Sequence, residues 1–312
     1  MQDTLILLNR LASIVCFVIL GIFIMKRNIL TDKGKEIITI LLNRIALPAM
    51  IIAAYVKIEL TKDVIFNVLI VIVGALLVYL LNYIFALISA SYHRLTDESK
   101  SIYLNGALHS NTAFLAFPLL EAVFGTQGLF YATIYYMIDN ILFTTVGMRR
   151  FTTINGFKFP PVTIALIIAI VLMIIFNLIG FNCVTTFPYL VCHDLGQMTT
   201  PLAFIFMGML IYEYNLKDVL SNHLAHILVG VKMVIIPLIM AMILLIFKQR
   251  LEATLAIVIL VQSCMPSLSV LISMSYEYKQ DTKLASSLVV VGHVFSIVSI
   301  PILFFIFNLL FK

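Results

Sequence analysis

The stretch LHSNTAFLAFPLLEAVFGTQG, residues 108–128, is apolar enough to lie in a membrane, yet it contains its own interruptions. Pro118 stands in its middle, and the polar residues His109, Ser110 and Asn111 come before it. Proline removes a backbone hydrogen-bond donor and clashes with the preceding turn, so a helix opens locally there. Open backbone at membrane depth survives only where it is buried in protein or lines a watery cavity. The stretch therefore predicts a broken membrane helix, which is either part of a functional site or a simple proline kink.

The composition indicates an integral membrane protein. The chain has 312 residues, of which 62% are hydrophobic and only 11% are charged, whereas soluble domains are about half apolar and a quarter charged. The basic residues are scattered between apolar runs, a pattern that favours membrane loops over a nucleic-acid partner. We therefore expect a multi-pass protein of a cell membrane, with the lipid bilayer as its surroundings.

Ten apolar runs follow one another along the chain. A helix needs about 20 apolar residues to cross the hydrocarbon core, so the runs predict an all-α integral membrane fold with ten transmembrane helices. The expected spans are 4–25, 37–56, 64–90, 102–124, 129–148, 162–181, 197–213, 222–247, 252–275 and 284–310.

The chain divides into two halves of five runs each. We predict a first repeat over residues 1–150, a linker over 151–161 and a second repeat over 162–312. Because five is odd, the second half must cross the membrane in the opposite sense to the first. Such inverted-topology repeats are typical of secondary transporters.

The prolines support this repeat. The second and fourth runs contain Pro48 and Pro118, and the seventh and ninth contain Pro201 and Pro266. The spacing is 70 residues in the first half and 65 in the second. Chance similarity between apolar helices with prolines is the alternative interpretation.

Lysine and arginine set the predicted orientation. The odd-numbered connections hold twelve basic residues and the other face holds six. Since cytoplasmic loops carry the excess of Lys and Arg, the linker over 151–161 is predicted to be cytoplasmic and both termini extracytoplasmic.

Two broken helices at matching positions in an inverted repeat, the fourth and the ninth, are expected to cross near the bilayer midplane. There, helix N-termini attract anions and freed carbonyls hold cations. Two unrelated proline kinks are the alternative. The predicted substrate-binding residues are Asn111, Pro118, Ser263, Pro266 and Lys232, and the predicted coupling-ion residues are Asp139, Thr112 and Ser267.

Three ionisable side chains near mid-depth need separate interpretation. A carboxylate at the depth of Asp139 is costly and often functional or paired, so Asp139 is a candidate proton carrier, with a structural hydrogen bond as the alternative. Lys232 is expected to attract an anion or to pair with Asp139. His293 fits a satisfied core histidine better than a proton relay, whereas His109 is a somewhat stronger relay candidate because it adjoins Asn111.

The stretch SNTAFLAFPLLEAVFGTQGLFYATIYYMIDNILFTTVG resembles the fourth and fifth helices of the auxin efflux carrier family. NRIALPAMI, TTPLAFIFMGMLI and MPSLSVLISMSYEYKQD resemble its second, seventh and ninth helices. Asn111, Pro118 and Pro266 match the family motifs, whereas Asp139 stands where members often have Asn. The resemblance implies ten helices, a crossover of helices four and nine, and an elevator-like movement of a transport domain against a scaffold. The family includes plant auxin exporters and bacterial permeases for malate-like carboxylates.

The predicted function is therefore secondary transport of small organic anions, either malate-like dicarboxylates or auxin-like acids. A polytopic membrane enzyme and a channel are the alternatives, but no nucleophile, phosphate-loop or zinc motif stands out in the sequence. We expect no cofactor, with a proton or sodium as the coupling ion, and we leave a homodimer open. Cys183 and Cys192 share one loop that is predicted to be extracytoplasmic, where they either form a disulfide or remain free thiols.

Overall fold

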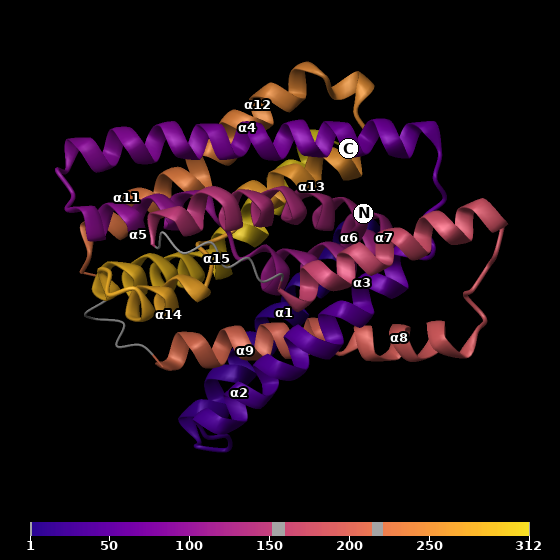
Figure 1. Cartoon of the computed structure of the whole chain (residues 1–312), viewed down its shortest axis with the longest axis horizontal. Coiled ribbons are helices and arrows are strands. Elements are labelled where there is room, and N and C mark those ends of the chain that lie inside the picture. The colour runs from indigo at the N-terminus through magenta and orange to yellow at the C-terminus, as the bar shows by residue number, and fades with distance from the viewer. Residues whose placement is uncertain (1, 152–159, 214–220, 312) are drawn as a thin grey trace. The chain divides into compact units, whose positions relative to one another are not determined.

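The computed structural model describes residues 2–151, 160–213 and 221–311, and every regular element within these ranges is a helix (Figure 1). Seven helical stretches of the described residues are long and apolar enough to cross a membrane. They are Lys33–Tyr55, Lys62–Tyr92, Thr112–Arg150, Pro161–Ile179, Phe187–Tyr212, His223–Ile246 and Thr282–Phe311. The expectation of an all-α membrane protein is confirmed, while the inverted repeat of ten helices stays a prediction.

Two of the three runs that are missing from the seven long stretches lie where helices are interrupted or joined. The third is the first run, whose apolar part Ala12–Lys26 is a shorter helix. The predicted ninth run is divided into α13 (Ala253–Ser263) and α14 (Val270–Glu277). The predicted fourth run begins in α5 (Asp97–Leu108) and continues into α6 (Phe117–Leu142). Within α6, Gly125 has φ 61° and ψ −148°, so two helices meet there where the fourth and fifth runs were expected to separate.

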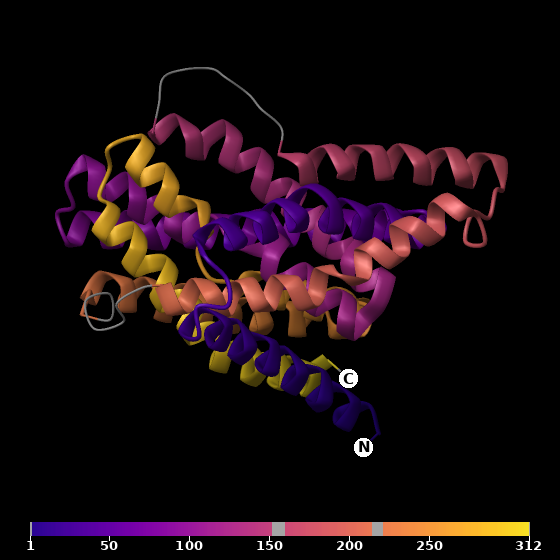
Figure 2. The same cartoon turned by 90° about the horizontal axis from the view of Figure 1, so that it is seen from below.

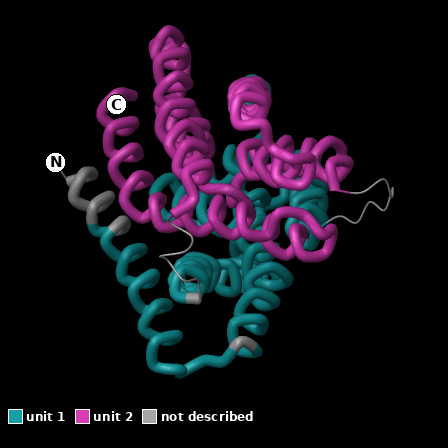
Figure 3. Tube along the Cα trace, turned by 90° about the vertical axis from the view of Figure 1, so that its left-hand side faces the viewer, with its two compact units in different colours: residues 1–69, 113–134, 158–213 teal, residues 70–112, 135–157, 214–312 magenta. Residues whose placement is uncertain are grey.

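The described chain forms two compact units (Figure 3). Unit 1 comprises residues 1–69, 113–134 and 158–213, and unit 2 comprises residues 70–112, 135–157 and 214–312. The predicted halves, residues 1–150 and 162–312, are sequence repeats, which is a different property from the compactness that defines the two units. The repeat therefore stays a prediction. Most of the predicted linker, residues 152–159, lies outside the described residues.

Unit 1 is built around two helix contacts. In the first, α1 (Gln2–Lys26) crosses α9 (Thr199–Glu213) (Figure 2) at Gly21 and Gly208, where a Cβ on either glycine would collide with the main chain of the other helix. In the second, α3 (Leu47–Tyr55) packs against α7 (Pro161–Ile179) and α8 (Phe187–Gln197). Close backbone approach, as between Gly21 and Gly208, is typical of helices packed in a membrane.

Cys183, in the loop before α8, and Cys192, in α8, are free thiols of unit 1. Cys183 is buried with Ala53 and Tyr189, and Cys192 packs against the same cluster. Burial raises the pKa of the Cys183 thiol above its usual value, because the thiolate is the form that burial disfavours. Of the two alternatives left open by the sequence, this conformation has the reduced pair.

Unit 2 is organised around α15 (Thr282–Phe311). This helix packs against α5, α13, α14 and α11 (His223–Gly230), while α12 (Ile236–Ile246) packs against α13. The second half of α4 (Lys62–Tyr92) belongs to the same unit. These helices hold the two interruptions, at residues 109–111 and 264–269, on which the site is built.

Three prolines follow short π-helical turns. The turns η1 (Leu42–Ala46), η2 (Thr112–Ala116) and η5 (Val231–Ile235) each end two residues before a proline, namely Pro48, Pro118 and Pro237. A proline has no N–H to donate and its ring crowds the carbonyl of the preceding turn, so the helix widens just before it. The sequence-predicted opening at Pro118 therefore takes the form of a π-helical turn.

Candidate functional site

The two helix interruptions of unit 2 pair with each other through their main chains. Ser110 and Ser267 form an isolated antiparallel bridge. The Asn111 N–H donates to the Pro266 carbonyl at 2.8 Å, and the Leu268 N–H donates to the His109 carbonyl at 3.3 Å. Backbone groups freed where α5 and α13 end thus find partners without water, as a membrane protein requires.

Asn111 links this pairing to α15. Its side-chain Nδ2 donates to Ser269 Oγ at 3.0 Å and lies 2.8 Å from His293 Nε2. His293 Nδ1 lies 2.7 Å from the Val289 carbonyl, which only accepts, so Nδ1 carries the hydrogen and Nε2 accepts from Asn111. His293 is therefore a neutral core histidine with both nitrogens satisfied, as the sequence analysis favoured.

Lys232 is completely enclosed, with 1% of its surface exposed, on the π-helical turn η5. Its Nζ donates to the Gly106 and His109 carbonyls, each at 2.9 Å. Ser267 Oγ also donates to the Gly106 carbonyl, at 2.7 Å. These carbonyls lie at the C-terminal end of α5, where the helix dipole is negative and a cation is stabilised.

Asp139 hydrogen-bonds to a histidine rather than to Lys232, the partner that the sequence analysis considered. Asp139 Oδ1 lies 2.9 Å from His109 Nδ1, with 1% of the His109 side chain and 13% of the Asp139 side chain exposed. When Asp139 is ionised it only accepts, and Nδ1 of His109 is then the donor. His109, flagged in the sequence only because it adjoins Asn111, is thus the residue that holds Asp139.

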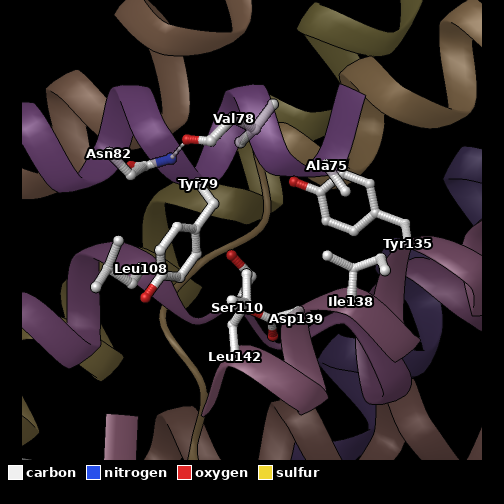
Figure 4. A pocket seen from close by; sticks show the side chains of 10 residues that line it. All are labelled: Ala75, Val78, Tyr79, Asn82, Leu108, Ser110, Tyr135, Ile138, Asp139 and Leu142. Carbon is white, nitrogen blue, oxygen red and sulfur yellow. Dashed lines mark hydrogen bonds between the residues drawn. The ribbon is translucent and has the colours of Figure 1, made fainter. Parts of the chain in front are cut away.

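A pocket opens beside this pair (Figure 4). Asp139 and Ser110 line it, and Tyr79 of α4 points its ring toward Leu108 and Ser110. Asn82 also lines it, and Asn82 Oδ1 is buried with no hydrogen-bond partner among the described residues. The sequence analysis missed Tyr79 and Asn82. The signal that it could have used is a polar amide within the long apolar run of α4.

The three hydroxyl residues predicted at the site differ in their partners. Ser263 Oγ donates to the Leu260 carbonyl at 2.7 Å and so belongs to the last turn of α13. Ser267 Oγ is engaged with Gly106, as described above. Thr112 Oγ1 is buried and has no partner among the described residues. Hydroxyl oxygens can still accept or coordinate after donating one hydrogen bond, so Thr112 and Ser267 remain available to a cation.

Within the described ranges, no group of three or more His, Cys, Asp or Glu side chains is placed to hold a metal ion. Unit 2 brings together all predicted site residues except one: Asn111, Thr112, Asp139, Lys232, Ser263, Pro266 and Ser267. Pro118 belongs to unit 1. The arrangement combines a buried cation, an amide donor and a histidine–carboxylate pair around paired helix interruptions.

Comparison with known proteins covers nearly the whole chain. A family model described as membrane transport protein matches residues 6–158 and 150–304. An uncharacterized transporter of Methanothermobacter thermautotrophicus is 24% identical over 303 residues, which cover 93% of this chain and 95% of that relative.

Proposed function

This chain belongs to the membrane transport protein family, and we propose that it is a secondary transporter of small organic anions of the carboxylate class. The membership confirms the resemblance to auxin efflux carriers at the level of the family and makes the chain a multi-pass membrane protein. The observation that carries the proposal is the enclosed Lys232, whose Nζ contacts the His109 carbonyl in the first interruption. Asn111 lies in the same interruption and pairs with Pro266 in the second. A buried cation recognises a carboxylate, and Asn111 Nδ2 can donate to the same carboxylate by giving up its hydrogen bond to Ser269 Oγ.

The mechanism that we propose is alternating access of the elevator type. Seven of the eight predicted site residues lie in one compact unit, so they can move as a body with their hydrogen bonds intact. The two paired helix interruptions support an inverted repeat, because such repeats place broken helices around a shared site. The basic residues support an orientation with both termini outside the cytoplasm.

Charge balance supports a proton as the coupling ion. In the empty site, the positive charge of Lys232 offsets the negative charge of Asp139, since the hydrogen bonds of both histidines fit their neutral forms. A monocarboxylate alone would leave one excess negative charge, and a proton alone one excess positive charge. Moving an excess charge through an apolar region is costly. The site therefore crosses the membrane either empty or loaded with both anion and proton.

Sodium is the second candidate coupling ion. Thr112 Oγ1 and Ser267 Oγ offer hydroxyl oxygens, and the interruptions offer carbonyls, which suit a hard cation. The same charge balance would hold with one sodium in place of the proton. We favour the proton because Asp139 already contacts a group that can exchange protons with it, namely His109.

Purified protein in proteoliposomes tests the proposal. A panel of dicarboxylates, monocarboxylates and aromatic acids is offered under a pH gradient or a sodium gradient. A carrier gives saturable uptake and counterflow, whereas a channel gives large unitary currents without counterflow. An enzyme would return the substrate chemically changed. Absence of saturable uptake and counterflow for every anion class would refute the proposed function.

Asn111→Ala provides the matching site variant. Loss of a hydrogen bond to a charged group costs about 1.5–3 kcal/mol, so carboxylate affinity should fall by roughly one to two orders of magnitude. Asn177→Ala is the control, because Asn177 donates to main-chain carbonyls within unit 1, whereas the predicted carboxylate-binding residues Asn111 and Lys232 belong to unit 2. Unchanged affinity in Asn111→Ala would place the substrate site elsewhere.

A further inference from the structure

The pocket beside Asp139 lies between two helix faces of unit 2, whose side chains face each other across it (Figure 4). Its lining residues occupy positions i, i+3, i+4 and i+7 along α4, from Ala75 to Asn82, and the same positions along α6, from Tyr135 to Leu142. Residues at this spacing lie on one side of a helix. The pocket is therefore formed by regular helix faces, whose side chains can select a ligand.

The pocket also borders the first helix interruption, because Leu108 and Ser110 line it. These two residues flank His109, whose carbonyl accepts a hydrogen bond from Lys232 Nζ at 2.9 Å. Ser110 is also the neighbour of Asn111, the proposed amide donor to the substrate. A carboxylate held by Lys232 and Asn111 therefore has this pocket as the adjoining space for the rest of its molecule.

The lining combines hydrocarbon with acceptors and lacks a cation. Ala75, Val78 and Leu108 are each at most 5% exposed and contribute hydrocarbon. Asp139 is the one side chain among the ten lining residues that is ionised at neutral pH, and it is negative. Asn82 adds a buried acceptor, Oδ1, which has no partner among the described residues. Such a lining accepts an apolar group and offers nothing that compensates a negative charge.

A second carboxylate in this pocket is disfavoured in both protonation states of Asp139. An ionised Asp139 repels it, because like charges repel strongly in a medium of low dielectric constant. If Asp139 is protonated, the charge of Lys232 offsets only one of the two carboxylates, and the excess negative charge is costly inside the membrane. Arg150 acts on the Tyr79 hydroxyl, but it does not line the pocket. A monocarboxylate with one proton leaves no excess charge.

The pocket is also small. Its cavity volume is about 10 Å³ for a water-sized group, which is the space that one water molecule needs. A methyl group is of similar size, whereas an aromatic ring needs much more room. The substrate therefore extends only a short distance beyond its carboxylate.

We propose that this pocket holds the hydrocarbon end of the substrate, and that the substrate is a short aliphatic monocarboxylate of about the size of propionate. This inference rests on the proposed function, within which it excludes dicarboxylates and aromatic acids. The methyl end lies between the α4 face at Val78 and the α6 face at Ile138, while Lys232 and Asn111 hold the carboxylate.

Matched pairs of acids separate charge from size. Propionate and malonate have the same chain length, as do butyrate and succinate, and each pair differs by a methyl group replaced with a carboxylate. Calorimetry with purified protein at neutral pH should show each monocarboxylate binding at least about tenfold more tightly, because an uncompensated buried charge costs more than the roughly 1.4 kcal/mol of a tenfold ratio. Binding of malonate and succinate that is equal or tighter would overturn the proposal.

Phenylacetate tests the size of the pocket, because it carries a single carboxylate on a large body. It should bind more weakly than propionate. If phenylacetate binds as tightly as propionate, the pocket does not hold the end of the substrate.

Val78→Ala enlarges the pocket without changing its charge. One methylene in a hydrophobic pocket changes selectivity by about 10- to 200-fold, so the affinity for valerate relative to propionate should rise about tenfold or more. Val71→Ala is the matched control, because Val71 is 0% exposed and lies two turns earlier on the same side of α4 without lining the pocket. Should Val78→Ala not fold, Leu142→Ala enlarges the pocket from α6 and should shift the ratio in the same direction. An unchanged ratio in the folded variant would overturn the proposal.

Transport distinguishes failure of this inference from failure of the proposed function. Counterflow is measured in proteoliposomes, with protein-free liposomes as the control because short acids cross bilayers in their protonated form. Saturable counterflow of dicarboxylates in preference to propionate would refute the inference and leave the proposed function intact. Absence of binding and of counterflow for every carboxylate would refute the proposed function itself.

Discussion

Lys232→Met separates the role of a buried cation in binding from its role in folding. Each carbonyl that Lys232 contacts keeps a second donor: Ser267 Oγ for Gly106 and the Leu268 N–H for His109. The substitution therefore creates no orphaned carbonyl. It removes two charge-assisted hydrogen bonds of about 1.5–3 kcal/mol each, but it also removes a desolvation cost of several kcal/mol for the buried ammonium. Asp139 then loses the charge that offsets it, but it keeps its hydrogen bond with His109 Nδ1 and is 13% exposed, so we expect the free energy of unfolding to change by no more than about 2 kcal/mol.

The effect of Lys232→Met on binding should be larger. Loss of a charged partner for the carboxylate costs about 1.5–3 kcal/mol, so Kd should rise roughly 10- to 150-fold. Binding is measured by calorimetry with the carboxylate identified in the uptake screen. Stability is measured by size-exclusion chromatography after heating, because the chain has no tryptophan for fluorescence.

Two further variants make the experiment decisive. Lys248→Met is the control, since Lys248 Nζ donates to the Leu310 carbonyl at an exposed helix end. Lys232→Gln keeps a hydrogen-bond donor without the charge, so it should bind as weakly as Lys232→Met if charge is what the substrate needs. A Lys232→Met protein that is folded and binds with unchanged Kd would refute the role of Lys232 in anion recognition.

Three other predictions follow from the same structure. Asp139→Asn should keep substrate exchange but lose accumulation under a pH gradient, because the empty site would then carry the uncompensated charge of Lys232. Accumulation driven by a pH gradient alone in this variant would show that the role of Asp139 is structural. Single cysteines on a cysteine-free background should be labelled from outside at residue 187 and not at residue 155, and the reverse result in intact cells would invert the predicted topology. Gly125→Ala should lower the free energy of unfolding by about 1–3 kcal/mol, which is more than Gly180→Ala should. A Cβ meets no atom within 4 Å at either glycine, but Gly125 has φ 61° with ψ −148° whereas Gly180 has φ 64° with ψ 26°. Equal losses would show that backbone conformation is not the cause.

Local sequence predicted the interruptions of the fold well. Pro266 lies within its interruption, whereas the break at residues 109–111 comes before the π-helical turn that precedes Pro118. The effect of a proline on a helix is a matter of a missing donor and a steric clash. The sequence left two settings for the opened backbone, burial in protein or a watery cavity. In the structure the backbone finds a protein partner, since the Asn111 N–H donates to the Pro266 carbonyl. The number of separate crossings was harder to predict, because a glycine turn such as Gly125 hardly interrupts an apolar run.

The side-chain partners within the site could not be predicted from sequence in the same way. Asp139 lies 30 residues from His109, Lys232 lies 123 residues from it, and Asn111 lies 182 residues from His293. Such pairings depend on which helix faces meet, and apolar runs without a clear polar stripe do not fix those faces. Charge alone suggested that Lys232 would attract an anion or pair with Asp139. The structure satisfies the lysine with carbonyls instead, because the end of α5 presents several of them at the break.

The position of His109 between the two charges suggests how substrate and proton become linked. Lys232 holds the carbonyl of His109, and Asp139 holds its ring. Under the proposed function, a carboxylate that draws Lys232 toward itself would weaken the hold on that carbonyl, and a proton on Asp139 would reverse its hydrogen bond with His109 Nδ1. Both events therefore act on one enclosed residue at the end of α5. Coupling needs a group whose state depends on both ligands, and in this arrangement His109 meets that requirement.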